Sequence, residues 1–228
     1  MPKRSKRYNA VAKKITANKS YNSTEAIAFL KEAPTKFDSS IELHVRLGID
    51  PKKSDQTVRG SVQLPHGTGK TKRIIAFVGG NAEADAKAAG VDIIGTTEVI
   101  QAIKATGKID FDIAVATPDM MKQLAPVARI LGQKGLMPNP KTDTVGPDVK
   151  KMITALKKGK VNFKNDATAN VHLAVGKLSF TPEQLAENVT ATIDALRKAK
   201  PAGSKGQYFK SVTLTSTMGP GVAISVAA

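Results

Sequence analysis

Cysteine and tryptophan are absent from the 228-residue sequence, and histidine occurs only three times. Without cysteine the chain can form no disulfide, no thiolate nucleophile and no cysteine-ligated metal site. His44, His66 and His172 have no second ligand at the spacing typical of structural zinc. We therefore expect no bound metal and no other cofactor.

Long apolar runs are also absent. No segment approaches the ~20 continuous apolar residues that cross a membrane. Residues 1–15 carry several charges but lack the apolar core of a secretory signal. We therefore expect a cytoplasmic protein without a membrane partner.

Acidic residues are few, with 19 Asp and Glu against 35 Lys and Arg, which gives a formal net charge of +16. Such an excess is typical of proteins with a polyphosphate partner, RNA or DNA, while an anionic membrane surface is the weaker alternative. Residues 68–159 hold 14 basic and 9 acidic side chains, a net of +5, which leaves +11 on the two flanking segments. The flanks are therefore predicted to carry the binding surface.

Signatures of catalysis are incomplete. The segment PHGTGKT, residues 65–71, resembles the end of a P-loop, but Leu64 replaces its first glycine and the β-rich KRIIAFV follows where a helix is needed. Asp110 and Asp112 flank Phe111 at a strand start, where exposed carboxylates are usual. No serine, histidine and acid combination has the context of a nucleophile elbow. We predict no enzymatic activity and interpret residues 65–71 as a crossing between domains.

Both flanks show the alternation typical of strands with one polar face. Residues 41–47 alternate apolar and polar side chains, and residues 57–64 are predicted to be their partner strand. Residues 161–166 and 170–178 are predicted to form a hairpin. Further strands are predicted at 211–217 and 222–226, with helices at 3–15, 25–33 and 181–200.

The middle of the chain alternates short apolar strands with helical segments, which predicts a parallel sheet with helices on its faces. The stretch RILGQKGLMPNPKTDTVG, residues 129–146, holds three glycines and two prolines and is predicted to be a shaped loop. The other predicted elements are strands at 74–78, 91–95 and 111–116 and helices at 82–89, 97–104, 120–131 and 148–158.

The polar face of the flanking strands is the candidate RNA site, with an ordinary solvated face as the alternative interpretation. Phe37 and Met218 stand at predicted turns, where an apolar group can stack on an unpaired base. Hydroxyl groups and Gly219 permit close approach to ribose 2′-OH groups. The candidate RNA-binding residues are Lys36, Phe37, Glu42, His44, Arg46, Lys164, Asp166, His172, Ser211, Thr213, Thr215, Thr217, Met218 and Gly219.

Four stretches resemble the ribosomal protein L1 family: PKRSKRY, SDQTVRGSVQLPHGTGK, RILGQKGLMPNPKTDTVG and TSTMGPG. The resemblance covers nearly the whole chain and implies an α/β fold of two domains. The first is an α+β sheet domain built from both chain ends, residues 1–67 and 160–228. The second is an inserted Rossmann-like parallel α/β domain, residues 68–159.

The resemblance also implies a function. It implies a constituent of the large ribosomal subunit that binds rRNA at the mobile stalk through Phe37, Thr217, Met218 and Gly219. It further implies that the stalk moves as deacylated tRNA leaves, and that the protein represses its own operon mRNA at a site imitating the rRNA. We expect a monomer outside the ribosome. A nucleotide-using enzyme built on the inserted domain, and a DNA or anionic-membrane binder, are the alternative hypotheses.

Overall fold

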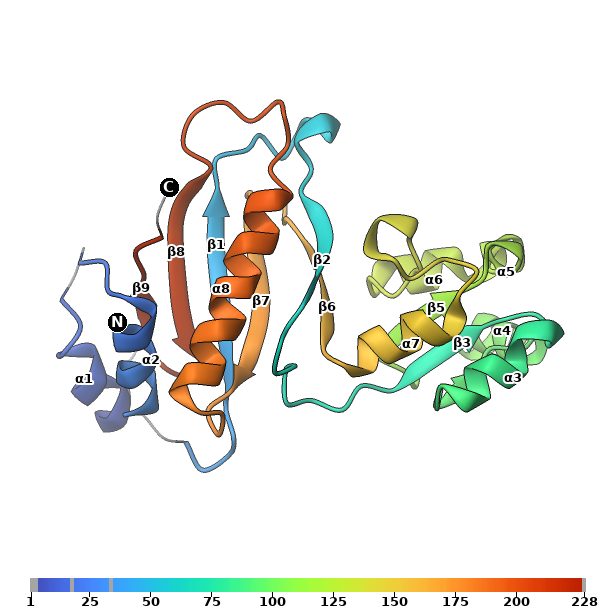
Figure 1. Ribbon diagram of the computed structural model, residues 1–228, viewed down its shortest axis with the longest axis horizontal. Coiled ribbons are helices and arrows are strands. Elements are labelled where there is room, and N and C mark those ends of the chain that lie inside the picture. The colour runs from blue at the N-terminus through green and yellow to red at the C-terminus, as the bar shows by residue number, and fades with distance from the viewer. Residues whose placement is uncertain (1–3, 17–18, 33–34, 227–228) are drawn as a thin grey trace. The chain divides into compact units, whose positions relative to one another are not determined.

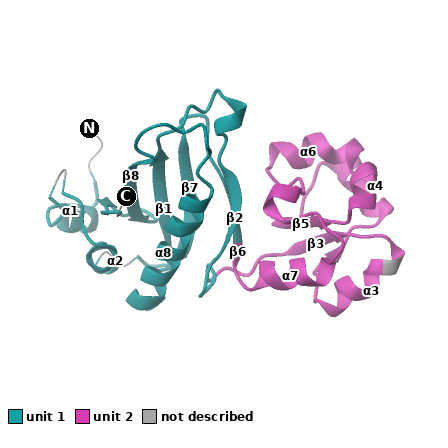
Figure 2. Cartoon of the chain, turned by 45° about the horizontal axis from the view of Figure 1, so that its top comes forward, with its two compact units in different colours: residues 1–69, 161–228 teal, residues 70–160 magenta. Residues whose placement is uncertain are grey.

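The computed structural model describes residues 4–16, 19–32 and 35–226, which form two compact units (Figure 2). Unit 1 combines the chain up to Gly69 with the chain from Val161 onward, and unit 2 is Lys70–Lys160. The predicted fold class is confirmed, because unit 1 is an α+β sheet unit made from both chain ends and unit 2 contains a parallel sheet. Independent folding of the two predicted domains stays a prediction.

A four-stranded antiparallel sheet lies at the centre of unit 1 (Figure 1). Its order is β7-β1-β8-β9, so β1, from the N-terminal half, lies between two strands from the C-terminal part. The strands are β1 (Ser40–Leu47), β7 (Asn170–Lys177), β8 (Phe209–Ser216) and β9 (Gly221–Ala223).

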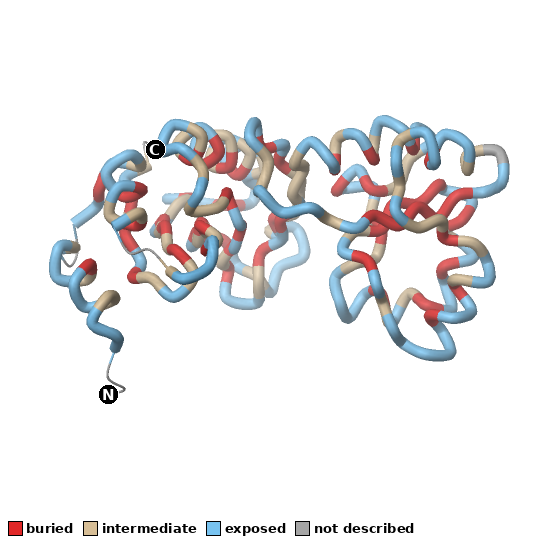
Figure 3. Tube along the Cα trace, turned by 90° about the horizontal axis from the view of Figure 1, so that it is seen from below, coloured by how far each residue is buried: buried red, intermediate tan, exposed pale blue. Residues whose placement is uncertain are grey.

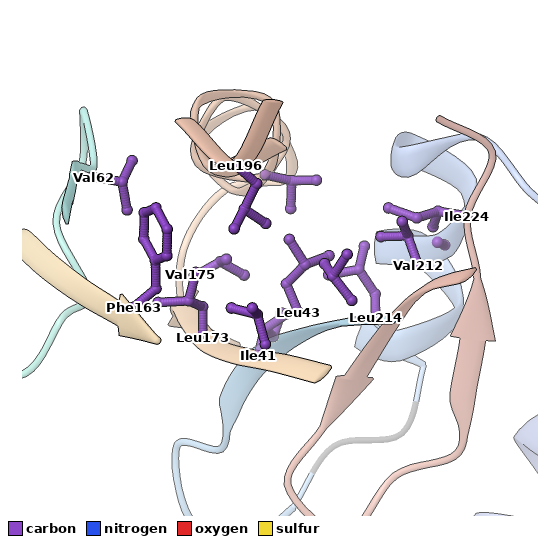
Figure 4. Close-up of a cluster of buried hydrophobic side chains, with 14 of the residues drawn as sticks. Ile41, Leu43, Val62, Phe163, Leu173, Val175, Leu196, Val212, Leu214 and Ile224 are labelled. Carbon is purple, nitrogen blue, oxygen red and sulfur yellow. The ribbon is translucent and has the colours of Figure 1, made fainter. Parts of the chain in front are cut away.

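One face of this sheet packs against two helices, α2 (Ser23–Lys31) and α8 (Pro182–Lys198). The alternating apolar side chains of the strands form the core with them, and Figure 4 shows Leu43, Leu214 and Leu196 within it. Helix α8 begins where predicted, because Thr181 and Gln184 form a capping box before the apolar stripe. The opposite face, which we call the outer face, carries the polar residues of the same strands.

Two predicted strand pairings are wrong. Strand β2 (Arg59–Gln63) pairs with β6 (Lys160–Lys164) in a separate two-stranded sheet, rather than β2 with β1 and β6 with β7. An inner strand has only two edges, and both edges of β1 are occupied by eight-residue partners. Val58 and Asn165 fasten the β2–β6 pair, because the Asn165 side chain accepts from Val58 N at 2.8 Å.

Unit 2 contains a three-stranded parallel sheet of order β4-β3-β5. Ile75 and Phe77 of β3 point into one apolar core, while Ile74 and Ala76 point into another. The sheet is therefore covered on both faces, as predicted, and the buried residues are red in Figure 3. The elements are β3 (Ile74–Phe77), β4 (Ile93–Ile94), β5 (Ile113–Ala116), α3 (Gly80–Ala88), α4 (Thr97–Thr106) and α7 (Val149–Lys157).

The predicted helix over residues 120–131 is interrupted. Pro126 lies in a 3-10 turn, η2 (Ala125–Val127), which separates α5 (Pro118–Gln123) from α6 (Ala128–Gln133). The first five residues of the predicted 129–146 loop are therefore helical. The remainder is shaped by Asn139, which binds Thr142 and Thr144 around η3 (Pro140–Thr142).

The N-terminal helix α1 (Lys6–Ala12) is shorter than predicted, and Lys3 lies outside the described residues. Helix α2 begins earlier than predicted, because Asn22 and Glu25 form its capping box. A short 3-10 helix, η1 (Ser54–Gln56), precedes β2. No helix within the described ranges is long and apolar enough to cross a membrane.

Candidate nucleic-acid interface

The outer face of β7, β1 and β8 carries a polar ladder, which Ala174 interrupts on β7. His44 on β1 lies opposite His172 on β7 and Thr213 on β8. The neighbouring rows place Glu42 opposite Thr215, and Arg46 opposite Ser211. Seven predicted site residues are therefore brought together by register, which sequence alternation alone could not specify.

His44 and His172 are in direct contact. Their Nδ1 atoms lie 2.7 Å apart and their ring centroids 4.9 Å apart. Burial lowers the pKa of His44, the nearby His172 lowers it further, and Glu42 opposes both effects. His44 is therefore held in its neutral form more strongly than an ordinary histidine.

Asp166 lies next to this pair but its carboxylate is already used by its own turn. It accepts hydrogen bonds from Thr168 N at 2.8 Å, Thr168 Oγ1 at 2.7 Å and Asn170 N at 2.7 Å. These bonds, with that from Asn170 N the largest contribution, hold the pKa of Asp166 well below its usual range. Asp166 therefore shapes the turn before β7, which makes it a poorer candidate for direct RNA contact than predicted.

The end of β8 is tied to the start of β1. Thr217 N donates to Ser40 O at 3.0 Å, and Ser40 N donates to Thr217 Oγ1 at 3.2 Å. The hydroxyl that was predicted to face RNA thus also holds two strands together. Because Ser40 follows the Phe37 turn and Thr217 precedes Met218, these bonds bring the two turns to the same end of the sheet.

Phe37 and Met218 are the two large apolar side chains that stand exposed among the described residues, at 53% and 74%. Lys36, also exposed, adjoins Phe37 in the same bend. Met218 adopts φ 64°, a left-handed conformation that is uncommon for a side chain of its size. Exposed apolar groups at turns beside a polar ladder are suited to stacking on unpaired bases.

Gly219 is also constrained by the protein itself. A Cβ at this position would lie 2.1 Å from Ser216 Oγ, within the protein itself. The absence of a side chain is therefore first a requirement of the β8–β9 turn, whatever approaches from outside.

Lys164 is not part of the ladder. It belongs to β6, whose partner is β2, and it alternates with the buried Phe163. Its side chain is exposed on a neighbouring sheet, because the predicted β6–β7 hairpin does not form.

The phosphate-loop-like segment of residues 65–71 is fastened to α8. His66 N donates to Asn188 Oδ1 at 3.2 Å, and Asn188 Nδ2 donates to Gly67 O at 3.0 Å. The strand β3 follows, where a P-loop requires a helix. The segment thus serves as the predicted crossing out of unit 1. Within the described parts of the chain, no three or more His, Cys, Asp or Glu side chains are arranged so that they could hold a metal ion.

Residues 29–220 match the Ribosomal protein L1p/L10e family. The chain belongs to this family. Similar proteins include the large ribosomal subunit protein uL1 of Rhodococcus erythropolis, 50% identical over 98% of this chain and 94% of that protein. The proteins of the same name from Chloroflexus aurantiacus and Kosmotoga olearia are 50% and 49% identical, over 98% and 97% of this chain and 96% of each relative.

Two cationic residues of this L1-family chain lie at the candidate interface without having been predicted there. Arg7 on α1 donates from Nη2 to Met218 O at 3.4 Å. Lys177 donates from Nζ to Asp38 O at 3.2 Å and Ser40 Oγ at 3.1 Å. The basic composition of the N-terminus was the available signal for Arg7, but its partner lies 211 residues away in sequence.

Proposed function

We propose that this chain is a constituent of the large ribosomal subunit, in the cytoplasm, and binds a folded segment of its rRNA through the outer face and the Phe37 and Met218 turns. The family match and the names of the relatives support the ribosomal assignment. The residue assignment rests on the structure of unit 1. The proposal assigns no enzymatic activity.

The exposure of Phe37 and Met218 carries the proposal. Large apolar side chains are costly to leave in water, and elsewhere in the described chain they are covered. Thr217 and Ser40 hold both turns at one end of the polar ladder. An RNA loop with unstacked bases would cover both side chains, while the hydroxyls of β8 and the carboxylate of Glu42 bind ribose and base-edge groups.

The net charge of +16 supplies the affinity for phosphates. Carboxylates lie among the polar groups of the outer face, so phosphates are expected at its margins. Lys36 lies outside the ladder in the Phe37 turn, and Arg46 occupies the last row of the ladder on β1. This division assigns affinity to the margins and selectivity to the ladder.

The further roles that the family implies belong to the same proposal. We propose that the chain assists release of deacylated tRNA as the stalk moves, represses its own operon mRNA through an rRNA-like site, and is a monomer when free. A single RNA-binding surface supports the mRNA role, because an mRNA that imitates the rRNA would compete for the same face. Competition between the operon mRNA and rRNA for the purified protein tests this point.

The decisive experiment measures affinity for deproteinised large-subunit rRNA at fixed salt. Met218→Ala and Phe37→Leu should each weaken binding by roughly tenfold to a hundredfold, since one stacked base contributes about 1–3 kcal/mol. Met137→Ala removes a methionine that packs against the core of unit 2 and serves as a control outside the proposed site, and melting temperatures report folding. Wild-type affinity in both turn variants would remove these turns from the site.

A further inference from the structure

Four titratable side chains lie in a line at the β1–β7 edge of the outer face. The central contact is the 2.7 Å Nδ1–Nδ1 approach of His44 and His172. His44 Nε2 lies 3.7 Å from a Glu42 carboxylate oxygen, and His172 Nε2 lies 3.6 Å from one of Asp166. The order is carboxylate, imidazole, imidazole, carboxylate.

This geometry restricts the number of protons that the two rings can hold. A hydrogen bond between the two Nδ1 atoms needs one hydrogen between them, so a doubly charged pair would bring two N–H groups together. In a neutral pair, the ring that donates from Nδ1 turns an Nε2 lone pair toward a carboxylate. A pair with one added proton avoids both problems: a single hydrogen lies between the two Nδ1 atoms, and each ring turns an Nε2–H toward a carboxylate.

The surroundings indicate which ring carries the charge. The His172 side chain is 54% exposed and that of His44 is 31% exposed, so water stabilises a charge better on His172. Burial and His172 lower the pKa of His44. The turn keeps Asp166 ionised by holding its pKa low, so His172 retains an anionic neighbour.

The remaining neighbours add one further charge. On β1 the residues two positions away from His44 are Glu42 and Arg46, and β8 presents the uncharged Thr213 opposite it. On β7 the residues two positions away from His172 are Asn170 and Ala174, which are also uncharged. The pair therefore responds to its two carboxylates, to Arg46 and to whatever binds the face.

We infer that His44 and His172 share a single proton and that RNA binds this singly protonated pair, with uptake of a proton on binding. The inference rests on the proposed function. Phosphates bound at the margins of the outer face add negative charge near the pair and favour its singly protonated form in the complex. The complex then binds more protons than the free protein, so affinity must rise as pH falls.

The test measures affinity for deproteinised large-subunit rRNA from about pH 8 to about pH 6, the range in which histidine titrates. Wild-type affinity should rise at least about threefold, below the limit of about tenfold per pH unit for one proton. The double variant His44→Gln/His172→Gln should bind with little pH dependence. The control is His66→Gln, which replaces the third histidine. It should behave as wild type, because His66 lies in the segment attached to α8, where it pairs with Glu187 rather than with His44 or His172.

Ring nitrogen chemical shifts of the free protein give a second readout. The Nδ1 hydrogen between the rings should belong to His172, with His44 accepting it at Nδ1 and keeping its own hydrogen on Nε2. Two rings that become charged together, or equal pH dependence in the wild type and the double variant, would overturn the inference while leaving RNA binding intact. Absence of rRNA binding at every pH would instead overturn the proposed function, and this inference with it.

Discussion

Replacing Gly219 by alanine should destabilise unit 1 through one identifiable clash. The new Cβ would lie 2.1 Å from Ser216 Oγ and 3.2 Å from Ser216 O. Ser216 is buried, and its hydroxyl has no hydrogen-bond partner among the described residues. The hydroxyl must therefore rotate or the turn must shift, and overpacking of this kind costs about 1–3 kcal/mol.

The same contact predicts a rescue. Ser216→Ala removes the clashing oxygen and an unpaired buried hydroxyl, so by itself it should change the free energy of unfolding by less than about 1 kcal/mol. In the double variant the 2.1 Å contact is gone, and the nearest remaining atoms are Ser216 O at 3.2 Å, a tight contact, and the Ser216 Cβ position at 3.4 Å, so the rescue should be partial. The coupling energy between the two substitutions should be about 1 kcal/mol or more.

Urea unfolding, monitored by tyrosine fluorescence, measures this coupling energy in unit 1. The sequence has three tyrosines and no tryptophan, and Tyr8, Tyr21 and Tyr208 all belong to unit 1. Additive effects of the two substitutions would refute the assigned clash. If the double variant regains stability, its remaining loss of rRNA affinity measures what Gly219 contributes to binding itself.

Three further predictions concern the whole chain. Affinity for rRNA should fall by roughly 10³ between about 50 and 200 mM salt if ~6 phosphates are neutralised, and a flat salt dependence would count against phosphate contacts. Replacing residues 70–159 by a short Gly and Ser linker should leave a folded unit 1 with most of its rRNA affinity. The reason is that β2 leads out of unit 1 and β6 leads back into it, and these two strands are paired. A shortened protein that is unfolded by circular dichroism would contradict the domain assignment. Lys70→Ala should leave rRNA affinity nearly unchanged, and calorimetry should detect no ATP or GTP binding to either protein; micromolar binding lost in the variant would revive the nucleotide-site hypothesis.

The periodicity of apolar residues predicted the individual helices and strands of this fold better than it predicted which strands pair with each other. The alternation of residues 41–47 determines which side chains of β1 are buried, and Thr181 with Pro182 marks the start of α8. Pairing is different, because several strands share the same pattern and β1 has room for only two of them. The break at Pro126 was readable from the sequence, since proline lacks the N–H that a helix interior needs.

In the candidate site, too, the sequence predicted which residues lie on the polar face but not which of them are in contact. Alternation placed His44 and His172 on one polar face, but only the register brings their nitrogens together. Strand alternation placed Asp166 on the polar face, whereas the bonds that occupy its carboxylate depend on the local turn. Arg7 could not be placed beside Met218, because nothing in a single sequence relates residues at opposite ends of the chain.

The position of β1 between β7 and β8 has a consequence for synthesis of the protein. On the ribosome that makes it, β1 emerges early and has two unpaired edges until residues 170–216 have followed. Unit 2 can close its own sheet first, because β3, β4 and β5 are near neighbours in sequence. The outer face is completed only when β8 docks, so an unfinished chain presents only part of the surface that we propose to bind RNA.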